Sequence, residues 1–285
     1  MVHLGSVPDQ HRSGVDPDAG RAKGASRLNP LGPLLDLIFP PLCPGCGERL
    51  LSAGRLCRDC AGALPEFGGE GCGICGAQGD PLSEGGEVCV RCSTDPPPFR
   101  RVYAAVPFAP PVDGWIHRFK YGRERALAAV LAGLVAQRID PRGEVPPPAF
   151  LVPVPLHPTR LRERGFNQAL LLARSLGKWW RIPVLPSLIE RIRPTPPQAR
   201  LDHAARRANV AGAFRLRGAV RGERLLLVDD VMTTGATVGA CAEILREGGA
   251  SRIDVVTVAR ARRRLSHTEG GEGTRKGRPS GSHPT

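Results

Sequence analysis

The sequence predicts an α/β protein with a parallel sheet, preceded by a small cysteine-rich module. Short β-branched segments alternate with helical segments of roughly ten residues or more along the second half of the chain, a pattern typical of strand–helix–strand units. Eight of the nine cysteines form four Cys-x-x-Cys pairs between Cys43 and Cys92. A length of 285 residues leaves room for one α/β domain of ordinary size and a small additional unit.

The expected elements follow in chain order. An apolar helix or turn at 34–42 leads into the cysteine pairs, and residues 100–108 alternate like a strand. Residues 112–121 and 124–138 have the pattern of two helices joined by a turn. The series of strands and helices that follows comprises 149–154, 167–180, 183–193, 203–209, 213–216, 224–230, 237–249 and 252–260.

These elements divide the chain into five segments. Both ends are polar and of low complexity, which is typical of segments that cannot bury a core. We expect a disordered extension at 1–30, the cysteine-rich module at 31–97, a connecting strand and helix segment at 98–140, the α/β domain at 141–262 and a disordered basic tail at 263–285.

The composition excludes membrane insertion and favours anionic ligands. Forty Lys and Arg against 27 Asp and Glu give a net charge of +13, of which much lies in the tail. No apolar run approaches the roughly 20 residues that a membrane span needs. The N-terminus has no apolar core of a secretion signal, so we expect a cytoplasmic protein.

The cysteine pairs predict two structural Zn²⁺ sites. A two-residue gap lets a turn aim two thiolates at one ion, and a second pair completes a tetrahedron without an open position for water. Disulfides would need an oxidising compartment, and a thioredoxin-like redox site would use one pair rather than four. How the pairs combine is left open. The predicted ligands are Cys43, Cys46, Cys57, Cys60, Cys72, Cys75, Cys89 and Cys92.

The segment 225–237, LLLVDDVMTTGAT, predicts a phosphate-binding strand, loop and helix. Its apolar residues make a buried parallel strand, so Asp229 and Asp230 lie at the carboxyl end, where open α/β sheets bind ligands. Gly235 allows a ligand close to the backbone, and the helix start attracts an anion. The segment is neither a Walker loop nor a dinucleotide fingerprint. Acids beside a phosphate cradle suit a sugar phosphate.

This segment resembles the phosphoribosyl pyrophosphate (PRPP) motif of type I phosphoribosyltransferases. Further motifs resemble those of the ComF/GntX family, namely VPVPLHPTRLRERGFNQA at 152–169, RIRPTPPQARLDHAARRANVAGAF at 191–214, LLDLIFPPLC at 34–43 and FKYG at 119–122. The resemblance covers residues 31–260. It implies a type I phosphoribosyltransferase-like domain behind an N-terminal double zinc ribbon.

The resemblance also implies roles for particular residues. Asp229 and Asp230 would contact the ribose hydroxyls, the turn 155–160 would bind pyrophosphate, and 193–200 would form a mobile flap. Mg²⁺ would accompany PRPP, and arginines would stabilise the leaving group. The 5-phosphate would contact Thr233, Thr234, Gly235, Ala236 and Thr237. The candidate arginines are Arg160, Arg164, Arg193, Arg200 and Arg206. Arg164 is assigned to PRPP binding, and Arg193 is assigned to catalysis together with Asp229 and Asp230.

Structural explanations compete with several of these roles. The segment Arg164–Gln168 also has the pattern of a helix entry, in which Asn167 caps the helix and Phe166 packs. We expect Trp179 and Trp180 to pack rather than to stack on a base. His117 and His157 have no partners that the sequence identifies, and Cys241 is expected to be a small packed residue.

Three functions are compatible with these residues. The first is a phosphoribosyltransferase or PRPP-binding enzyme, whose acceptor the sequence does not identify. The second follows from the resemblance, which associates this architecture with competence: a factor that handles single-stranded DNA through the phosphate site and zinc ribbons, with competence-machinery proteins as partners. In the third, the ribbons dock a protein while the α/β domain senses PRPP. Net positive charge supports phosphate binding of any kind.

Overall fold

The computed structural model describes residues 40–50, 56–69, 71–79, 82–83, 86–143, 147–194 and 210–262. All elements below lie in the compact unit Pro41–Thr285. Several expectations fall outside the described residues: the extension 1–30, most of the apolar segment 34–42, the helix at 203–209, the tail 263–285, and the candidates Arg200 and Arg206.

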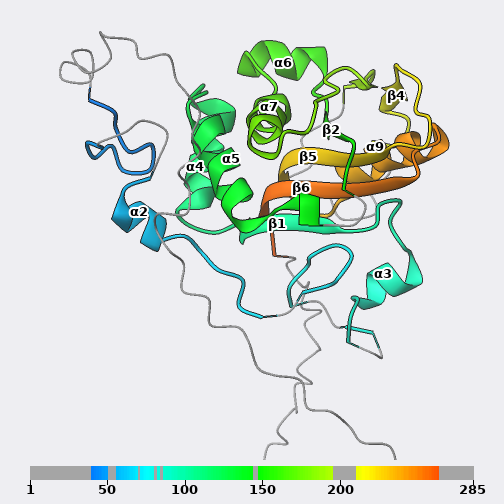
Figure 1. Cartoon of the computed structure of the whole chain (residues 1–285), viewed down its shortest axis with the longest axis horizontal. Coiled ribbons are helices and arrows are strands. Elements are labelled where there is room, and N and C mark those ends of the chain that lie inside the picture. Colours follow the sequence, from blue (N-terminus) through cyan, green and yellow to red (C-terminus); the bar gives the residue numbers. More distant parts are fainter. Residues whose placement is uncertain are drawn as a thin grey trace, which may run out of the picture. The chain divides into compact units, whose positions relative to one another are not determined.

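Four parallel strands form the central sheet, in the order β1, β6, β5, β2 (Figure 1). The last of them in the chain, β6 (Arg252–Arg260), lies between β1 (Val102–Pro107) and β5 (Arg224–Met232), with β2 (Phe150–Pro153) at the far edge. Val184 adds one parallel bridge beside β2. The sequence predicts each of these strands, so the parallel α/β class is confirmed.

Helices cover both faces of this sheet. On one face lie α4 (Val112–Tyr121), α5 (Leu127–Arg138) and α7 (Gln168–Trp180). On the other face α9 (Ala236–Glu247) packs together with the second half of the cysteine-rich module. All four helices are predicted from their apolar periodicity.

Burial on both faces explains the uninterrupted apolar run that begins β5. Leu226 and Val228 point to the face covered by α4, α5 and α7, whereas Leu225 and Leu227 point to the face covered by α9. Successive strand residues face opposite sides, so a strand buried on both must be apolar at every position. The run ends where the two aspartates begin.

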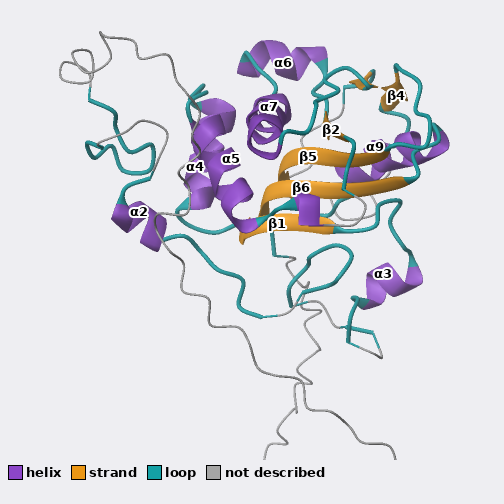
Figure 2. Cartoon of the chain, in the orientation of Figure 1, coloured by secondary structure: helices purple, strands orange, loops and turns teal. Residues whose placement is uncertain are grey.

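Shorter elements complete the described chain. The cysteine-rich segments consist of loops with two short helices, α2 (Arg58–Gly62) and α3 (Val90–Thr94) (Figure 2). A small antiparallel ribbon pairs β3 (Ile189–Arg191) with β4 (Phe214–Leu216), and a 3-10 turn spans Pro141–Gly143. Among the residues described, no helix has the length and hydropathy needed to cross a membrane.

The helix α6 (Pro158–Arg164) is absent from the sequence prediction, which treats 155–160 as a turn. Pro158 begins the helix, at a position where no intrahelical N–H donor is needed. The Nδ1 atom of His157 caps the helix by accepting from the Thr159 N–H at 3.3 Å, so His157 has a structural partner. The loop after β2 is therefore shorter than predicted.

The structural explanation for the entry of α7 is confirmed. The Oδ1 atom of Asn167 accepts from the Leu170 N–H at 3.3 Å, and Phe166 is buried. Trp180 packs in the core as expected, whereas Trp179 is 46% exposed. The expectation that both tryptophans pack is therefore wrong for Trp179, which faces outward at the end of the helix.

Candidate functional site

The turn between β5 and α9 has the geometry of an anion-binding loop. Gly235 precedes the first residue of α9 with φ of +83°, a left-handed conformation that glycine adopts readily. A Cβ atom there would lie 2.7 Å from Cε of the buried Met232. The N–H groups at the start of α9 attract an anion. We call residues 233–237 the phosphate loop; it contains the five residues predicted to contact the 5-phosphate.

Two carboxylates, Asp229 and Asp230, precede this loop near the end of β5. Asp230 is buried, and its Oδ1 atom lies 3.0 Å from Nζ of Lys120. Asp229 is half-buried, and its Oδ1 atom accepts from the Asp230 N–H at 2.9 Å. Burial raises the pKa of Asp229 to about 7, and the neighbouring Asp230 contributes to the rise. The carboxyl group of Asp229 therefore binds a proton more tightly than an ordinary aspartate does.

Lys120 belongs to this site, although the sequence analysis assigns it no role. Its helix, α4, is amphipathic: Ile116 and Phe119 are buried, and the neighbouring Lys120 reaches β5. The ion pair with Asp230 brings together two parts of the chain that are far apart in sequence. The available signal was the FKYG segment at 119–122, in which Lys120 is the only cation.

Arginines add positive charge around Asp229. Arg164, at the end of α6, lies over the ring of Tyr121 at 5.2 Å from its centroid. Its charge lowers the pKa of Asp229, opposing the effect of burial. Burial lowers the pKa of Arg191, and the charges of Arg160 and Arg164 lower it further. The side chains of Arg160, Arg164 and Arg191 therefore lie near one another and near Asp229. Arg191 is not among the arginines predicted from the sequence.

Arg193, the predicted catalytic arginine, is exposed. Its Nη2 atom donates to the carbonyl oxygen of Ala211 at 2.5 Å, which links the segment after β3 to the segment before β4. Most of the predicted flap, at 195–200, lies outside the described residues. The catalytic role of Arg193 therefore stays a prediction, whereas Arg164 is a predicted arginine whose charge reaches the acidic pair.

The paired cysteines form two groups of four, combined sequentially. The sulfur atoms of each group lie within 4.8 Å of one another. Two of the sulfur separations are 3.6 and 3.8 Å, whereas a disulfide would require about 2.05 Å. Thiolates about 2.3 Å from one Zn²⁺ would lie about 3.8 Å apart, so each group fits a structural zinc ion. The first group is Cys43, Cys46, Cys57 and Cys60, and the second group is Cys72, Cys75, Cys89 and Cys92.

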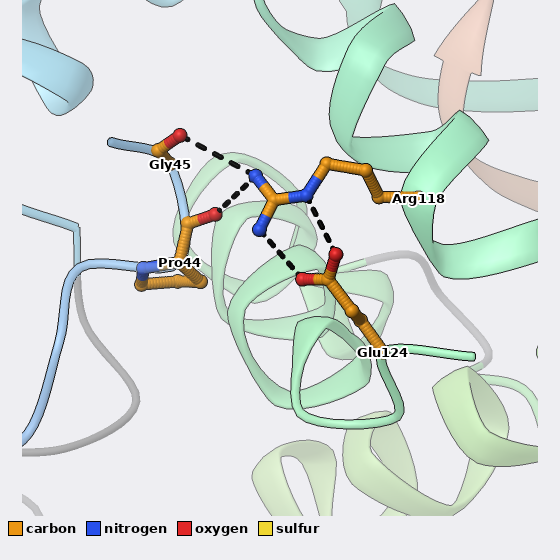
Figure 3. A network of polar contacts seen from close by, with 4 residues as sticks. All are labelled: Pro44, Gly45, Arg118 and Glu124. Carbon is orange, nitrogen blue, oxygen red and sulfur yellow. Dashed lines mark hydrogen bonds and ion pairs between the residues drawn. The ribbon is translucent and has the colours of Figure 1, made fainter. Parts of the chain in front are cut away.

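Arg118 ties the first group to α4. Figure 3 shows its guanidinium between the carboxylate of Glu124 and the carbonyl oxygens of Pro44 and Gly45. The Nε and Nη2 atoms donate to Glu124 at 2.8 and 2.6 Å, and Nη1 donates to Pro44 at 2.8 Å and Gly45 at 3.4 Å. The first Cys-x-x-Cys turn is therefore attached to the helix that carries Lys120.

A cavity of about 250 Å³ borders the phosphate loop on the side of the second group. Arg91 lines it from the cysteine-rich module, and Thr234 and Gly235 line it from the loop. The carboxylates of Asp95 and Glu243 also face it, so its walls carry both signs of charge. Neither Asp229 nor Asp230 lines this cavity, so it adjoins the phosphate loop rather than the acidic pair.

Two protein families match this chain. A double zinc ribbon domain matches residues 34–93, and a phosphoribosyl transferase domain matches residues 185–272. The chain is 34% identical over 228 residues to "DNA utilization protein YhgH" of Salmonella typhi. The matched region covers 79% of this chain and 99% of that protein. It is 31% identical over 227 residues to "Competence protein F" of Haemophilus influenzae, covering 77% and 96%.

Solved structures include a more distant match. Adenine phosphoribosyltransferase from Leishmania tarentolae is 12% identical, with a TM-score of 0.31, over 50% of this chain and 74% of that protein.

Proposed function

Because the chain belongs to the ComF family, which joins a double zinc ribbon to a phosphoribosyltransferase-like domain, we propose that it binds PRPP or a related phosphorylated ribose at the end of β5. The observation that supports this most directly is the order of groups in space: the pair Asp229 and Asp230, then the phosphate loop opening α9. Carboxylates accept from ribose hydroxyls, and a helix N-terminus attracts phosphate. A sugar phosphate presents both groups.

In this proposal Asp229 and Asp230 accept from the ribose 2- and 3-hydroxyls, and the phosphate loop binds the 5-phosphate. Asp229 accepts best when ionised, so a cation near the pair would favour binding. Carboxylate and diphosphate oxygens are the hard donors that Mg²⁺ prefers, so the residues present fit Mg²⁺ arriving with PRPP. When bound, Mg²⁺ would neutralise charge on the departing pyrophosphate.

Ribosyl transfer would break the bond from C1 to pyrophosphate and form a bond from C1 to a nucleophilic acceptor. Positive charge develops on the ribose, and negative charge develops on the leaving group. Arg160, Arg164 and Arg191 would stabilise that negative charge. Arg193 would join them from the segment after β3, as the family resemblance implies.

The names of the relatives lead us to propose a role in DNA uptake or utilisation in the cytoplasm, with competence-machinery proteins as partners. A second candidate function is binding of single-stranded DNA without catalysis, which the surroundings of Tyr121 favour. Tyr121 is 59% exposed, lies against Arg164 and is 4.9 Å from the His117 ring. Exposed aromatic rings beside cations are typical of surfaces on which unpaired bases stack.

Ligand-induced changes in melting temperature distinguish these functions. PRPP with Mg²⁺ should raise the melting temperature by an amount that grows with the logarithm of its concentration. The double variant Asp229→Asn and Asp230→Asn should lose this rise, and Asp140→Asn, at an exposed carboxylate paired with Arg142, should keep it. A wild-type protein that does not respond to PRPP would contradict the proposal.

The DNA-binding alternative predicts a different result. Affinity for a single-stranded oligonucleotide should fall steeply with salt concentration, because binding releases counterions from phosphates. Tyr121→Ala should weaken it, since stacking contributes about 1–3 kcal/mol per base. An affinity that neither salt nor this substitution changes would exclude the alternative.

A further inference from the structure

Arg260 is a buried arginine at the C-terminal end of β6, with 2% of its surface exposed. Its backbone lies opposite Met232 of β5 on one side and Pro107 of β1 on the other. A guanidinium removed from water needs hydrogen-bond acceptors around it. Since Arg260 lies where β5 passes into the phosphate loop, the acceptors that it uses determine which segments it holds together.

The guanidinium of Arg260 joins the phosphate loop to the second cysteine group. Its Nη1 atom donates to the carbonyl oxygens of Met232 at 3.0 Å, of Ala261 at 2.9 Å and of Thr233. Its Nε atom donates to the carbonyl oxygen of Cys75 at 2.9 Å. One planar, rigid group therefore fixes the start of the loop against the turn that carries a predicted zinc ligand.

Arg91 makes a second connection from the opposite direction. It lies in α3 between Cys89 and Cys92, and its Nη1 atom donates to the carbonyl oxygen of Thr234 at 3.2 Å. The two arginines thus hold the carbonyl groups of consecutive residues, immediately before Gly235. Rotation of either peptide unit would break one of these hydrogen bonds, so together they restrict the loop to one conformation.

The charge of a zinc-loaded group would strengthen both connections. Four thiolates outweigh the two positive charges of Zn²⁺, so the loaded group is anionic. When the metal is lost, the Cys-x-x-Cys turns lose the ion that fixes them, so the carbonyl group of Cys75 and the helix that carries Arg91 are no longer held in place.

We propose that Arg260 and Arg91 are positioning residues through which the zinc-loaded second group holds the phosphate loop in its binding conformation. Metal loading of this group then controls affinity for the 5-phosphate, although none of its four cysteines belongs to the phosphate loop. Binding of the 5-phosphate rests on the proposed function. The hydrogen bonds by which Arg260 and Arg91 connect the second cysteine group to the phosphate loop do not depend on it.

The test compares Arg260→Gln and Arg91→Gln with a matched control, Arg101→Gln. Arg101 donates from Nε to the carbonyl oxygen of Gly73, in the same Cys-x-x-Cys turn as Cys75, and is exposed. The variants are compared for zinc content, for hydrogen exchange of the amides at 232–237, and for affinity for ribose 5-phosphate. Arg260→Gln should retain zinc, exchange faster across the loop and bind about tenfold more weakly.

Arg91→Gln should show the same changes to a smaller extent, and Arg101→Gln should match the wild type. If Arg260→Gln fails to fold, the same measurements on Arg91→Gln decide the question. Zinc-loaded variants of Arg260 and Arg91 with wild-type exchange at 232–237 would overturn the proposal. A wild type that does not bind ribose 5-phosphate would count against the proposed function, and the exchange comparison would still decide whether the arginines hold the loop.

Discussion

The two cysteine groups share one chemistry but differ in their surroundings. All four cysteines of the second group are buried and pack in the same apolar cluster as Leu225 and Leu227 of β5. In the first group, Cys46 is exposed and Cys60 is only half-buried. The second group is therefore part of the domain core, whereas the first group is attached at its surface.

The groups also reach different halves of the candidate site. The first is tied by Arg118 to α4, which supplies Lys120 to the acidic pair. The second is tied by Arg260 and Arg91 to the phosphate loop. One motif used twice is thus attached to the helix that carries Lys120 in one copy and to the phosphate loop in the other.

The largest expected difference is between Cys75→Ser and Cys46→Ser. A closed zinc site contributes on the order of 10 kcal/mol to folding, and Cys75 is buried in the core, so its replacement should prevent folding or lower the melting temperature drastically. Cys46→Ser should lose one zinc and keep a cooperative transition of the α/β domain. Zinc analysis with circular dichroism melts measures both. Equal damage from the two substitutions would contradict the comparison.

A smaller effect is expected from Gly45→Ala, within the first group. A Cβ atom at Gly45 would lie 2.7 Å from Sγ of Cys60 and 2.9 Å from Cζ2 of Trp115. We expect a loss of about 1–3 kcal/mol from overpacking, seen as faster zinc release to a chelator from one site per chain. Gly62→Ala, which meets nothing within 4 Å, is the control and should release zinc at the wild-type rate.

Arg118→Gln should have a still smaller effect on the first group. It removes the two-pronged contact with Glu124 and the hydrogen bonds to the first Cys-x-x-Cys turn, but both side chains of the ion pair are about 40% exposed. Solvent screening limits the loss to about 1 kcal/mol. The same chelator assay should show modestly faster release from one site, and release from both sites would show that Arg118 stabilises more than its own group.

A further prediction concerns the pH dependence of stability at the acidic pair. Burial raises the pKa of Asp229 from an ordinary 3.8 to about 7, so the folded protein binds this proton more tightly than the unfolded chain. This contribution to stability is present at acidic pH and is lost as pH rises through about 7. Asp229→Asn should therefore gain more in melting temperature relative to the wild type at pH 8 than at pH 5. A constant difference across this range would show that Asp229 is not the titrating group.

Much of the fold could be predicted because parallel strands buried on both faces leave a strong local pattern. The run that begins β5 is apolar at every position from Leu225 to Val228, β6 is apolar at most of its buried positions, and the periodicity of α7 and α9 is equally clear. The helix α6 left no such pattern, because its sequence PTRLRER buries none of its residues. Only the Pro158 start signal was available, and the family resemblance implied a pyrophosphate-binding turn at 155–160.

The candidate site was predictable where it is contiguous. Asp229, Asp230 and the phosphate loop follow one another in the chain, so one motif contains them. Lys120, Arg191 and Arg260 come from other elements and are placed by tertiary packing, which a single sequence does not show. Arg260 in particular is predicted only as the last residue of the strand 252–260, with no role of its own, although the structure buries its side chain in the core.

The position of β6 determines when the site can form during synthesis. This strand is the last described element of the chain, yet it lies inside the sheet, between β1 and β5. The cysteine groups, whose ligands are close in sequence, can capture metal while the ribosome is still translating later residues. The complete sheet, and the hydrogen bonds from Arg260 to the phosphate loop, can form only after residue 260 has left the ribosome. A nascent chain that ends before 252 should therefore hold zinc without holding a ligand.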